Sequence, residues 1–316
     1  MLILLSYGMP NFKLTTPVVL IMFSKLDTAD RVFAEIAKAK PTKLLVISDA
    51  ARPDKPGEAA KVAATRAIIQ RVDWECDVLT HFSEVNLGPR NRISSGIDWV
   101  FQQVEEAIIL EEDCLPDPTF FRFCQELLDR YRCDQRVGMI SGCNFQFGHQ
   151  RNEDSYYFSK YFHIWGMATW RDKWQNNYDV ALTEWPAIRD QNRVADLVGS
   201  HEESYKWAKK FELTYQNKIN TWDYQWVFAN WLQSKLCVVP TQNLVSNIGF
   251  AHPDAANTVK RCDEADVPIT RITFPLRHPL GFMRDLDADE YEYKRFIRSS
   301  LPKRVYYAIR RWCTGR

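Results

Sequence analysis

Residues 107–118 read AIILEEDCLPDP. The four leading apolar residues are typical of a strand that is buried on both faces of a sheet. Glu111, Glu112 and Asp113 follow them directly, and a Pro-Asp-Pro segment then stops the strand and turns the chain. The sequence therefore predicts three carboxylates at or just past the carboxyl end of a strand, which is where open α/β sheets bind their ligands.

Three adjacent carboxylates repel one another, so a cation would stabilise this acidic edge. Oxygen ligands in this number suit Mg²⁺ or Mn²⁺, shared with a phosphate-bearing substrate. The alternative is a solvated acidic loop, because acidic triplets are common on protein surfaces. The spacing of the acids alone leaves both interpretations open.

Two further strands are predicted on the amino-terminal side, at residues 18–24 and 43–50. A helix with an apolar face over residues 31–40 joins them. This βαβ unit indicates a parallel sheet with a right-handed crossover. Asp49 closes the second strand, where it is placed either to meet a ligand or to serve as an ordinary turn residue.

The pattern of strand and helix continues to residue 142 and predicts a doubly wound nucleotide-binding architecture. The helices are expected at residues 57–72, 94–106 and 119–131, the last with Thr119 as its N-cap, and the strands at 76–84 and 137–142. Before the second of these helices, a Gly-Pro loop carries Arg90 and Arg92. This loop is a candidate diphosphate site or, alternatively, a basic surface turn.

The composition limits the class of protein. A chain of 316 residues allows one large α/β domain or two smaller ones, and a net charge of +1 gives no field that would attract nucleic acid. The eight cysteines show neither CxxC nor zinc-finger spacing, which favours free thiols in a reducing cytoplasm. The apolar start of the chain is too short for a membrane span. The basic tail from Glu290 is a candidate for contact with an anionic membrane surface, or a docked terminal helix.

From residue 143 the composition becomes polar and aromatic. Residues 156–174 show no clean period, and we expect most of their rings to be core and some to line a flat ligand. Polar helical sequence follows at 179–218, then a helix within 219–233 and a strand-like segment at 236–249 that Pro240 interrupts.

Taken in order, these segments resemble the GT-A glycosyltransferases, and most closely the N-acetylglucosaminyltransferase I family. EEDCLPDPTFF is similar to that family's metal motif, IWGMATWRDKW to its acceptor-side segment and TWDYQW to the segment with the catalytic carboxylate. VVPTQNLVSNIGFAH is similar to its closing strand and loop. The resemblance spans residues 17–258. It departs from the family in its Glu-Glu-Asp motif and in the single Asp223, which Tyr224 follows.

The resemblance implies an α/β GT-A fold, a doubly wound mixed sheet with an appended acceptor-side subdomain. Its parts would be an N-terminal extension (1–14), a nucleotide-sugar-binding part (15–145), an acceptor-binding and catalytic part of the same domain (146–275) and a basic tail (276–316). The implied reaction is a metal-dependent, inverting transfer of a hexosyl or N-acetylhexosaminyl group. The donor would be a nucleotide-diphosphate sugar, above all a UDP-sugar, and the acceptor a hydroxyl of a glycan or lipid-linked saccharide, as in polysaccharide biosynthesis.

The resemblance also implies roles for single residues. Asp113 would be the direct ligand of Mn²⁺ or Mg²⁺, and Asp223 the general base, although an acid in the first turn of a helix also stabilises the helix dipole. His252 would be a second metal ligand or a diphosphate contact, or simply a structural histidine. The donor contacts would be Ser24, Asp49, Arg90, Arg92, Glu111, Glu112, Asn247 and Gly249.

Two other classes of protein fit parts of the pattern. A sugar-phosphate nucleotidyltransferase shares the sheet and the metal chemistry, but it normally carries a glycine-rich basic signature after its first strand. Here that position reads FSKLDTADR, without glycine. A non-catalytic carbohydrate- or nucleotide-binding module would instead use the aromatic residues as its binding surface.

Overall fold

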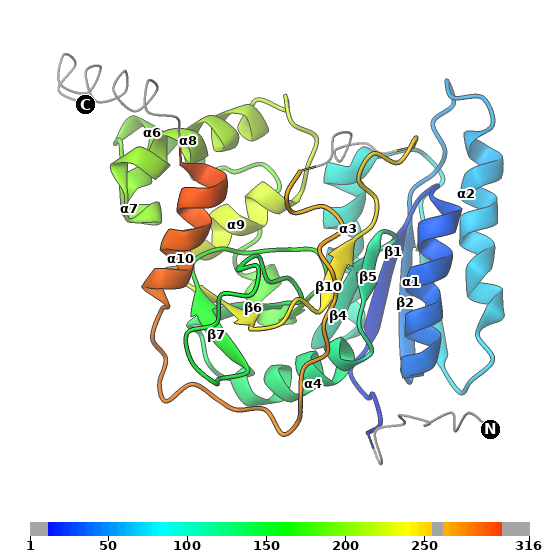
Figure 1. The fold of residues 1–316 in the computed structure, drawn as a ribbon. Coiled ribbons are helices and arrows are strands. Elements are labelled where there is room, and N and C mark those ends of the chain that lie inside the picture. The colour runs from blue at the N-terminus through cyan, green and yellow to red at the C-terminus, as the bar shows by residue number, and fades with distance from the viewer. Residues whose placement is uncertain (1–11, 255–261, 299–316) are drawn as a thin grey trace.

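The computed structural model describes residues 12–254 and 262–298. An eight-stranded sheet runs through them in the order β3-β2-β1-β4-β8-β6-β9-β7 (Figure 1). Its strands are β1 (Val18–Met22), β2 (Lys43–Ser48), β3 (Asp77–Phe82), β4 (Glu106–Glu111), β6 (Val137–Ser141), β7 (Tyr156–Ser159), β8 (Met167–Trp170) and β9 (Leu236–Pro240). A small antiparallel pair, β5 (Cys114–Pro116) and β10 (Val245–Asn247), lies beside it.

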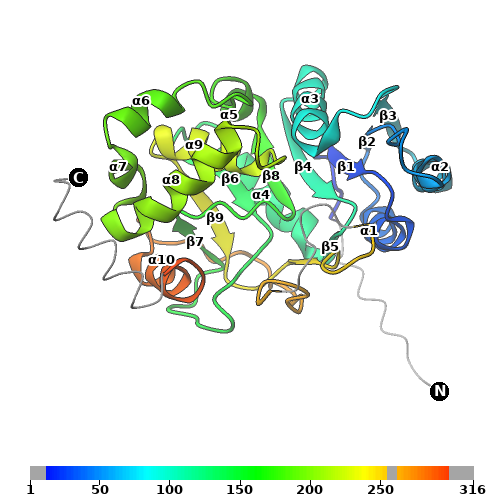
Figure 2. The same ribbon diagram turned by 90° about the horizontal axis from the view of Figure 1, so that it is seen from above.

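Helices cover both faces of the sheet. Figure 2 shows α3 and α9 on one side of it and α1 and α10 on the other. The helices are α1 (Leu26–Ala39), α2 (Glu58–Ala67) with a 3-10 turn (Ile68–Arg71), α3 (Gly88–Gln103), α4 (Thr119–Tyr131), α5 (Arg171–Gln175), α6 (Trp185–Asp190), α7 (Val194–Val198), α8 (His201–Tyr215), α9 (Asp223–Leu232) and α10 (Leu286–Glu292), which continues as a π turn (Tyr293–Ile297). The predicted doubly wound α/β architecture is confirmed.

The first half of the sheet is parallel, as predicted. β1 pairs in parallel with both β2 and β4, and every residue of β1 is buried. Successive side chains point to opposite faces, so Leu20 joins one apolar cluster with α1 and α4, while Val19 joins a second cluster with α3 and α9. Burial on both faces explains why these strands read as unbroken apolar runs.

The second half makes the sheet mixed. β8 lies between β4 and β6 and runs antiparallel to both, with Ala168 opposite Ile108 on one side and Ile140 on the other. β7 closes the sheet antiparallel to β9. Both β7 and β8 come from the aromatic segment 156–174, for which no strand was predicted. The expectation that most of its rings are core is confirmed, since Tyr156, Phe158, Trp170 and Trp174 are all buried.

Two predicted helix starts and one predicted cap are wrong. α1 begins at Leu26 and not at residue 31. α3 begins at Gly88 and not at residue 94, because Pro89 fits the first turn of a helix and extends it toward the amino end. α4 begins at Thr119, but the cap is the side chain of Asp117. One oxygen of that carboxylate accepts hydrogen bonds from the Thr119 backbone N–H at 2.9 Å and from its hydroxyl at 2.6 Å.

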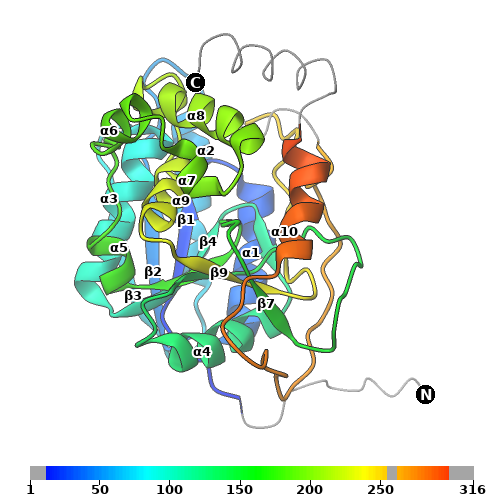
Figure 3. The same ribbon diagram turned by 90° about the vertical axis from the view of Figure 1, so that its left-hand side faces the viewer.

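The end of the described chain packs back onto β7 through α10 (Figure 3). The Ser159 hydroxyl donates to Asp289 at 2.5 Å, and His163 contacts Glu292 at 2.8 Å. The tail beyond residue 298 lies outside the described residues, as do residues 1–11 of the predicted extension, so membrane contact through the tail stays a prediction. Within 12–254 and 262–298 the helices are too short or too polar to cross a membrane.

Candidate active site

The acidic turn lies where predicted, at the carboxyl end of β4. The strand ends at Glu111, and Glu112 and Asp113 form the turn into β5. β5 then pairs with β10, which places Asn247 opposite Cys114, and the Ile248 backbone N–H donates to the Asp113 carbonyl at 2.8 Å. The predicted proximity of Asp113 to the loop at 247–249 is therefore present.

Gly249 makes this close approach possible. Its backbone N–H donates to the Asn247 side-chain oxygen at 2.9 Å. A Cβ added to Gly249 would lie 2.7 Å from Asp113 Cγ, a distance that real Cβ atoms do not show. The loop after β10 thus packs directly on the Asp113 carboxylate, which only glycine allows.

The acidic turn is also tied to the end of β1. Glu112 accepts hydrogen bonds from the backbone N–H groups of Phe23 at 2.7 Å and Lys25 at 3.3 Å. The Lys25 ammonium lies 2.5 Å from Asp113 Oδ2, and both side chains are about nine-tenths buried. Lys25 thus supplies one positive charge to a turn that carries three carboxylates.

The electrostatics reflect this imbalance. Burial, followed by the charge of Asp113, raises the pKa of Glu111 well above its usual value. Burial raises the pKa of Glu112 to about 7, although the Phe23 backbone N–H opposes this shift. For Lys25, burial alone would lower the pKa, but the charges of Asp113, Glu112 and Glu111 together outweigh it and the pKa is raised. The net negative charge of the turn therefore favours the binding of a further cation.

Asp223 approaches the acidic turn from the other half of the chain. It is the first residue of α9, and it accepts hydrogen bonds from the Thr221 hydroxyl and from the Tyr224 backbone N–H, the latter at 2.9 Å. Its negative charge contributes to the raised pKa of Glu111, after burial and the charge of Asp113, so Asp223 acts electrostatically on the acidic turn. Burial also raises the pKa of Asp223 itself.

A lysine that the sequence did not single out stands beside Asp223. The Lys210 ammonium lies over the rings of Trp207 and Tyr224, at 4.2 Å and 5.0 Å from their centroids. Burial lowers the pKa of Lys210, and the Asp223 charge opposes that shift. The helical period of α8 placed this residue on a helix, but nothing in the sequence indicated that it faces α9.

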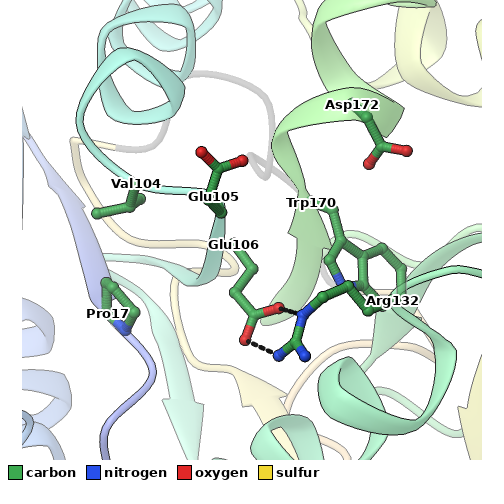
Figure 4. A pocket seen from close by; sticks show the side chains of 7 residues that line it. All are labelled: Pro17, Val104, Glu105, Glu106, Arg132, Trp170 and Asp172. Atoms are coloured by element: carbon green, nitrogen blue, oxygen red, sulfur yellow. Dashed lines mark hydrogen bonds and ion pairs between the residues drawn. The ribbon is translucent and has the colours of Figure 1, made fainter.

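Two surface depressions lie at opposite ends of the strands. One, of about 600 Å³, is lined by Ser24, Leu26, Asp27, Asp30, Lys61, Arg71, His252 and Asp254; Ser24 directly precedes Lys25, the partner of Asp113. The other, of about 550 Å³, is lined by Pro17, Val104, Glu105, Glu106, Arg132, Trp170 and Asp172 (Figure 4). Pro17 and Glu105 precede β1 and β4, so this second depression is at the amino ends of the strands, away from the acids.

Both arginines of the Gly-Pro loop point into the protein. The Arg90 guanidinium donates to the backbone carbonyls of Thr214, at 3.0 Å, and Val180. The Arg92 guanidinium donates to the His81 carbonyl at 2.6 Å. Both side chains are buried, so they brace α3 against neighbouring segments and do not join the acidic turn.

Two more predicted contacts have structural partners. The Asp49 carboxylate accepts hydrogen bonds from the backbone N–H groups of Ala50, Leu87 and Gly88, which fits its interpretation as a turn residue. His252 uses both ring nitrogens: Nε2 contacts Asp27 at 3.1 Å, and Nδ1 accepts from the Asp254 backbone N–H at 3.0 Å. His252 therefore lines the first depression with both ring nitrogens engaged by partners other than Asp113.

The acidic turn has the right kind of donor for a hard divalent cation, namely the carboxylate oxygens of Asp113 and Glu111. Within the described residues, no group of three or more His, Cys, Asp or Glu side chains is arranged to hold a metal by itself. Mg²⁺-type sites commonly use one or two protein carboxylates and complete their shell with water and substrate phosphates. The residues present therefore fit a cation that arrives with a diphosphate.

Comparison with known proteins gives distant likenesses of fold. No protein-family model and no curated protein matches this chain. The mannosyltransferase PcManGT from Pyrobaculum calidifontis, in complex with GDP-Man and Mn²⁺, is 13% identical with a TM-score of 0.37 over 54% of this chain and 49% of its own, about half its length. A UDP-glucose pyrophosphorylase complexed with UDP-glucose is 9% identical with a TM-score of 0.37 over 72% of this chain and 90% of its own. Mouse xyloside xylosyltransferase 1 is 11% identical with a TM-score of 0.33 over 68% and 81%.

Proposed function

We propose that this chain is a GT-A glycosyltransferase that moves a sugar from a nucleotide-diphosphate sugar to a hydroxyl acceptor. The observation that carries the proposal is the meeting of two parts of the chain at the carboxyl end of β4. Asp113 packs on the loop at 247–249, and the charge of Asp223, at the start of α9, acts on Glu111. A diphosphate clamp and a general base are the two components that the reaction requires.

The donor diphosphate is an anion, and the carboxylates of the acidic turn would repel it. We therefore assign Asp113 as the protein ligand of Mn²⁺ or Mg²⁺, which when bound neutralises the leaving diphosphate as a Lewis acid. Glu111 ends β4 directly before Glu112 and Asp113, and it is the candidate for contact with the donor sugar or ribose. His252 is left out of the metal's ligand set because both its ring nitrogens are engaged.

The nucleotide would enter the depression that begins at Ser24. Its volume of about 600 Å³ falls in the usual range for small-molecule sites, and it adjoins the acidic turn through Lys25. Asn247 and Gly249 would hold the far wall of the diphosphate site. Asp49 would act indirectly, by fixing the loop before α3. A UDP-sugar with a hexosyl or N-acetylhexosaminyl group is the first donor to test.

In the transfer step, Asp223 would accept the proton of the acceptor hydroxyl. The acceptor oxygen would then bond to the anomeric carbon while the bond from that carbon to the diphosphate oxygen breaks on the opposite face, which inverts the anomeric centre. Tyr224, which directly follows Asp223 and is only partly buried, would contact a saccharide acceptor. A glycan or lipid-linked saccharide suits that side of the site.

The direct test is a panel of nucleotide sugars incubated with the protein, Mn²⁺ and saccharide acceptors, with the released nucleotide measured. Release of a nucleoside diphosphate together with a lengthened acceptor is the expected result. Release of pyrophosphate from a nucleoside triphosphate and a sugar phosphate would instead identify a nucleotidyltransferase. Binding of nucleotide sugars without any turnover would identify a non-catalytic module, and either of these results overturns the proposal.

A further inference from the structure

The Lys25–Asp113 ion pair occupies the position that the proposed function gives to a divalent cation. Lys25 Nζ lies 2.5 Å from Asp113 Oδ2, with 11% and 10% of the two side chains exposed. Glu112 does not replace Asp113 as a ligand of the cation, because its carboxylate already accepts hydrogen bonds from the backbone N–H groups of Phe23 and Lys25. In this state Oδ2 of Asp113 is paired with an ammonium, and among the described residues Oδ1 accepts only from the Cys114 thiol, at 3.7 Å.

A divalent cation arriving alone would meet two obstacles. A metal ion on Asp113 would lie close to the Lys25 ammonium on the same carboxylate, and the two cations would repel each other. Displacing Lys25 from Asp113 would leave a largely buried ammonium without its anion, which is costly. The protein-only donor set is also small, since no three metal-binding side chains converge within the described part of the chain.

A nucleotide diphosphate removes both obstacles. Lysine carries a compact charge on a flexible four-carbon stem, so its ammonium can turn from a carboxylate to a phosphate oxygen. Lys25 directly follows Ser24, which lines the depression proposed for the nucleotide, so a phosphate bound there would lie close to its side chain. The phosphate oxygens would then accept the ammonium and also supply the missing ligands of the metal.

We propose that Lys25 is an exchangeable cation: it holds Asp113 in the donor-free protein and moves to the donor's diphosphate, so that Asp113 binds a divalent cation only together with a nucleotide. This inference rests on the proposed function. It adds that the divalent cation binds the donor site only together with the nucleotide. Lys25 is thereby a positioning residue of that site.

The test measures Mn²⁺ binding by electron paramagnetic resonance, without nucleotide, to the wild-type protein and to Lys25→Met. We expect weak binding to the wild-type protein and binding tighter by about tenfold or more to Lys25→Met, because Asp113 is then unpaired. Adding a nucleoside diphosphate should tighten Mn²⁺ binding to the wild-type protein and have a smaller effect on Lys25→Met.

Matched variants separate this effect from a general change of charge. Lys43→Met removes a lysine that also lies 2.5 Å from an aspartate, Asp77, at the amino ends of β2 and β3, and it should bind Mn²⁺ as the wild-type protein does. Lys25→Arg keeps the positive charge on Asp113 and should also remain weak. Lys25→Gln keeps a hydrogen bond to Asp113 without the charge, and it serves as the neutral variant if Lys25→Met does not fold.

Two results would overturn the inference. One is Mn²⁺ binding to the neutral Lys25 variants that is no tighter than to the wild-type protein. The other is an equal gain in Lys25→Arg, which would show that charge is not what keeps the metal away. Failure of every nucleotide to bind would instead count against the proposed function. The Mn²⁺ comparison without nucleotide would still test whether Lys25 keeps the metal from Asp113.

Discussion

Gly249 lies so close to Asp113 that a methyl group on its Cα would be 2.7 Å from the carboxylate carbon. The residues are far apart in sequence, and their contact joins the acidic turn after β4 to the loop after β10. The backbone hydrogen bond from Ile248 to the Asp113 carbonyl, at 2.8 Å, holds the same junction. The position of the Asp113 carboxylate therefore depends on the absence of a side chain at residue 249.

Gly249→Ala is expected to displace the Asp113 carboxylate, because the added methyl has no space. Overpacking of this kind lowers the free energy of unfolding by about 1–3 kcal/mol. Nucleotide affinity in Mn²⁺ should fall as well. Gly281→Ala is the control, since nothing lies within 4 Å of a Cβ built there. Urea unfolding and nucleotide titration of both variants measure the two effects; equal behaviour of the two would contradict the role of Gly249.

Asp223→Asn is expected to lower kcat by about 10²- to 10⁴-fold, the usual contribution of a general base, and to leave nucleotide affinity unchanged. Asparagine keeps an oxygen for the Thr221 and Tyr224 hydrogen bonds, so the fold should persist. Asp172→Asn is the matched control, because Asp172 is also an acid in the first turn of a helix but lies at the opposite end of the strands. Full turnover by Asp223→Asn would show that Asp223 is not the general base and only stabilises the start of α9.

The pH dependence of kcat/KM should report the environment of Asp223. Burial raises its pKa above the ordinary 3.8, and a base must be ionised to act, so activity should fall on the acid side at a higher pH than for an ordinary aspartate. The Lys210 charge lowers the pKa of Asp223. Lys210→Met should therefore move the acid limb to higher pH, whereas Lys209→Met, on the exposed side of α8, should not. A limb that stays in place in Lys210→Met would argue against this contact.

Glu111→Gln should stabilise the protein in the absence of metal and donor. Burial and Asp113 raise the pKa of Glu111 above its ordinary 4.5, so the folded protein binds this proton more tightly than the unfolded chain does. The stability from that proton is complete at low pH and is lost as the pH rises through the raised pKa. The gain of Glu111→Gln should be about 1 kcal/mol above neutral pH and vanish near pH 4.

Thermal unfolding of Glu111→Gln at several pH values measures this gain. Glu75→Gln, at an exposed position away from the acidic turn, should show no such pH-dependent difference from the wild-type protein. A Glu111→Gln variant less stable than the wild-type protein at pH 8 would mean that the carboxylate makes a favourable contact in the folded state.

The parallel half of the fold was predictable because its signals are local. The apolar run before Glu111 is buried on both faces, and the acids end it at the sheet's carboxyl edge. β8 was not predictable in the same way: Ala168 is in a strand because Ile108 and Ile140 flank it, and those partners are distant in sequence. Pro89 carried a usable signal for a helix start that was interpreted as a loop.

The same contrast between local signals and tertiary contacts applies to the candidate site. Asp113, Asn247 and Gly249 were predicted from motif order and do lie together. Lys25 and Lys210 were missed because single lysines carry no periodic or spacing signal, and only tertiary contacts give them an acidic partner. Arg90 was predicted as a diphosphate contact, and in the structure its guanidinium donates to the Thr214 carbonyl at 3.0 Å.

The most direct test of the central claim is calorimetric titration of nucleoside diphosphates, in the presence of Mn²⁺, into the wild-type protein and Asp113→Asn. Asp77→Asn, which alters an exposed aspartate at the other end of the strands, is the control. At least one diphosphate should bind the wild-type protein and Asp77→Asn alike, and bind Asp113→Asn more weakly by about tenfold or more. Equal affinity for all three proteins, or no binding of any diphosphate to the wild-type protein, would contradict a donor site at Asp113.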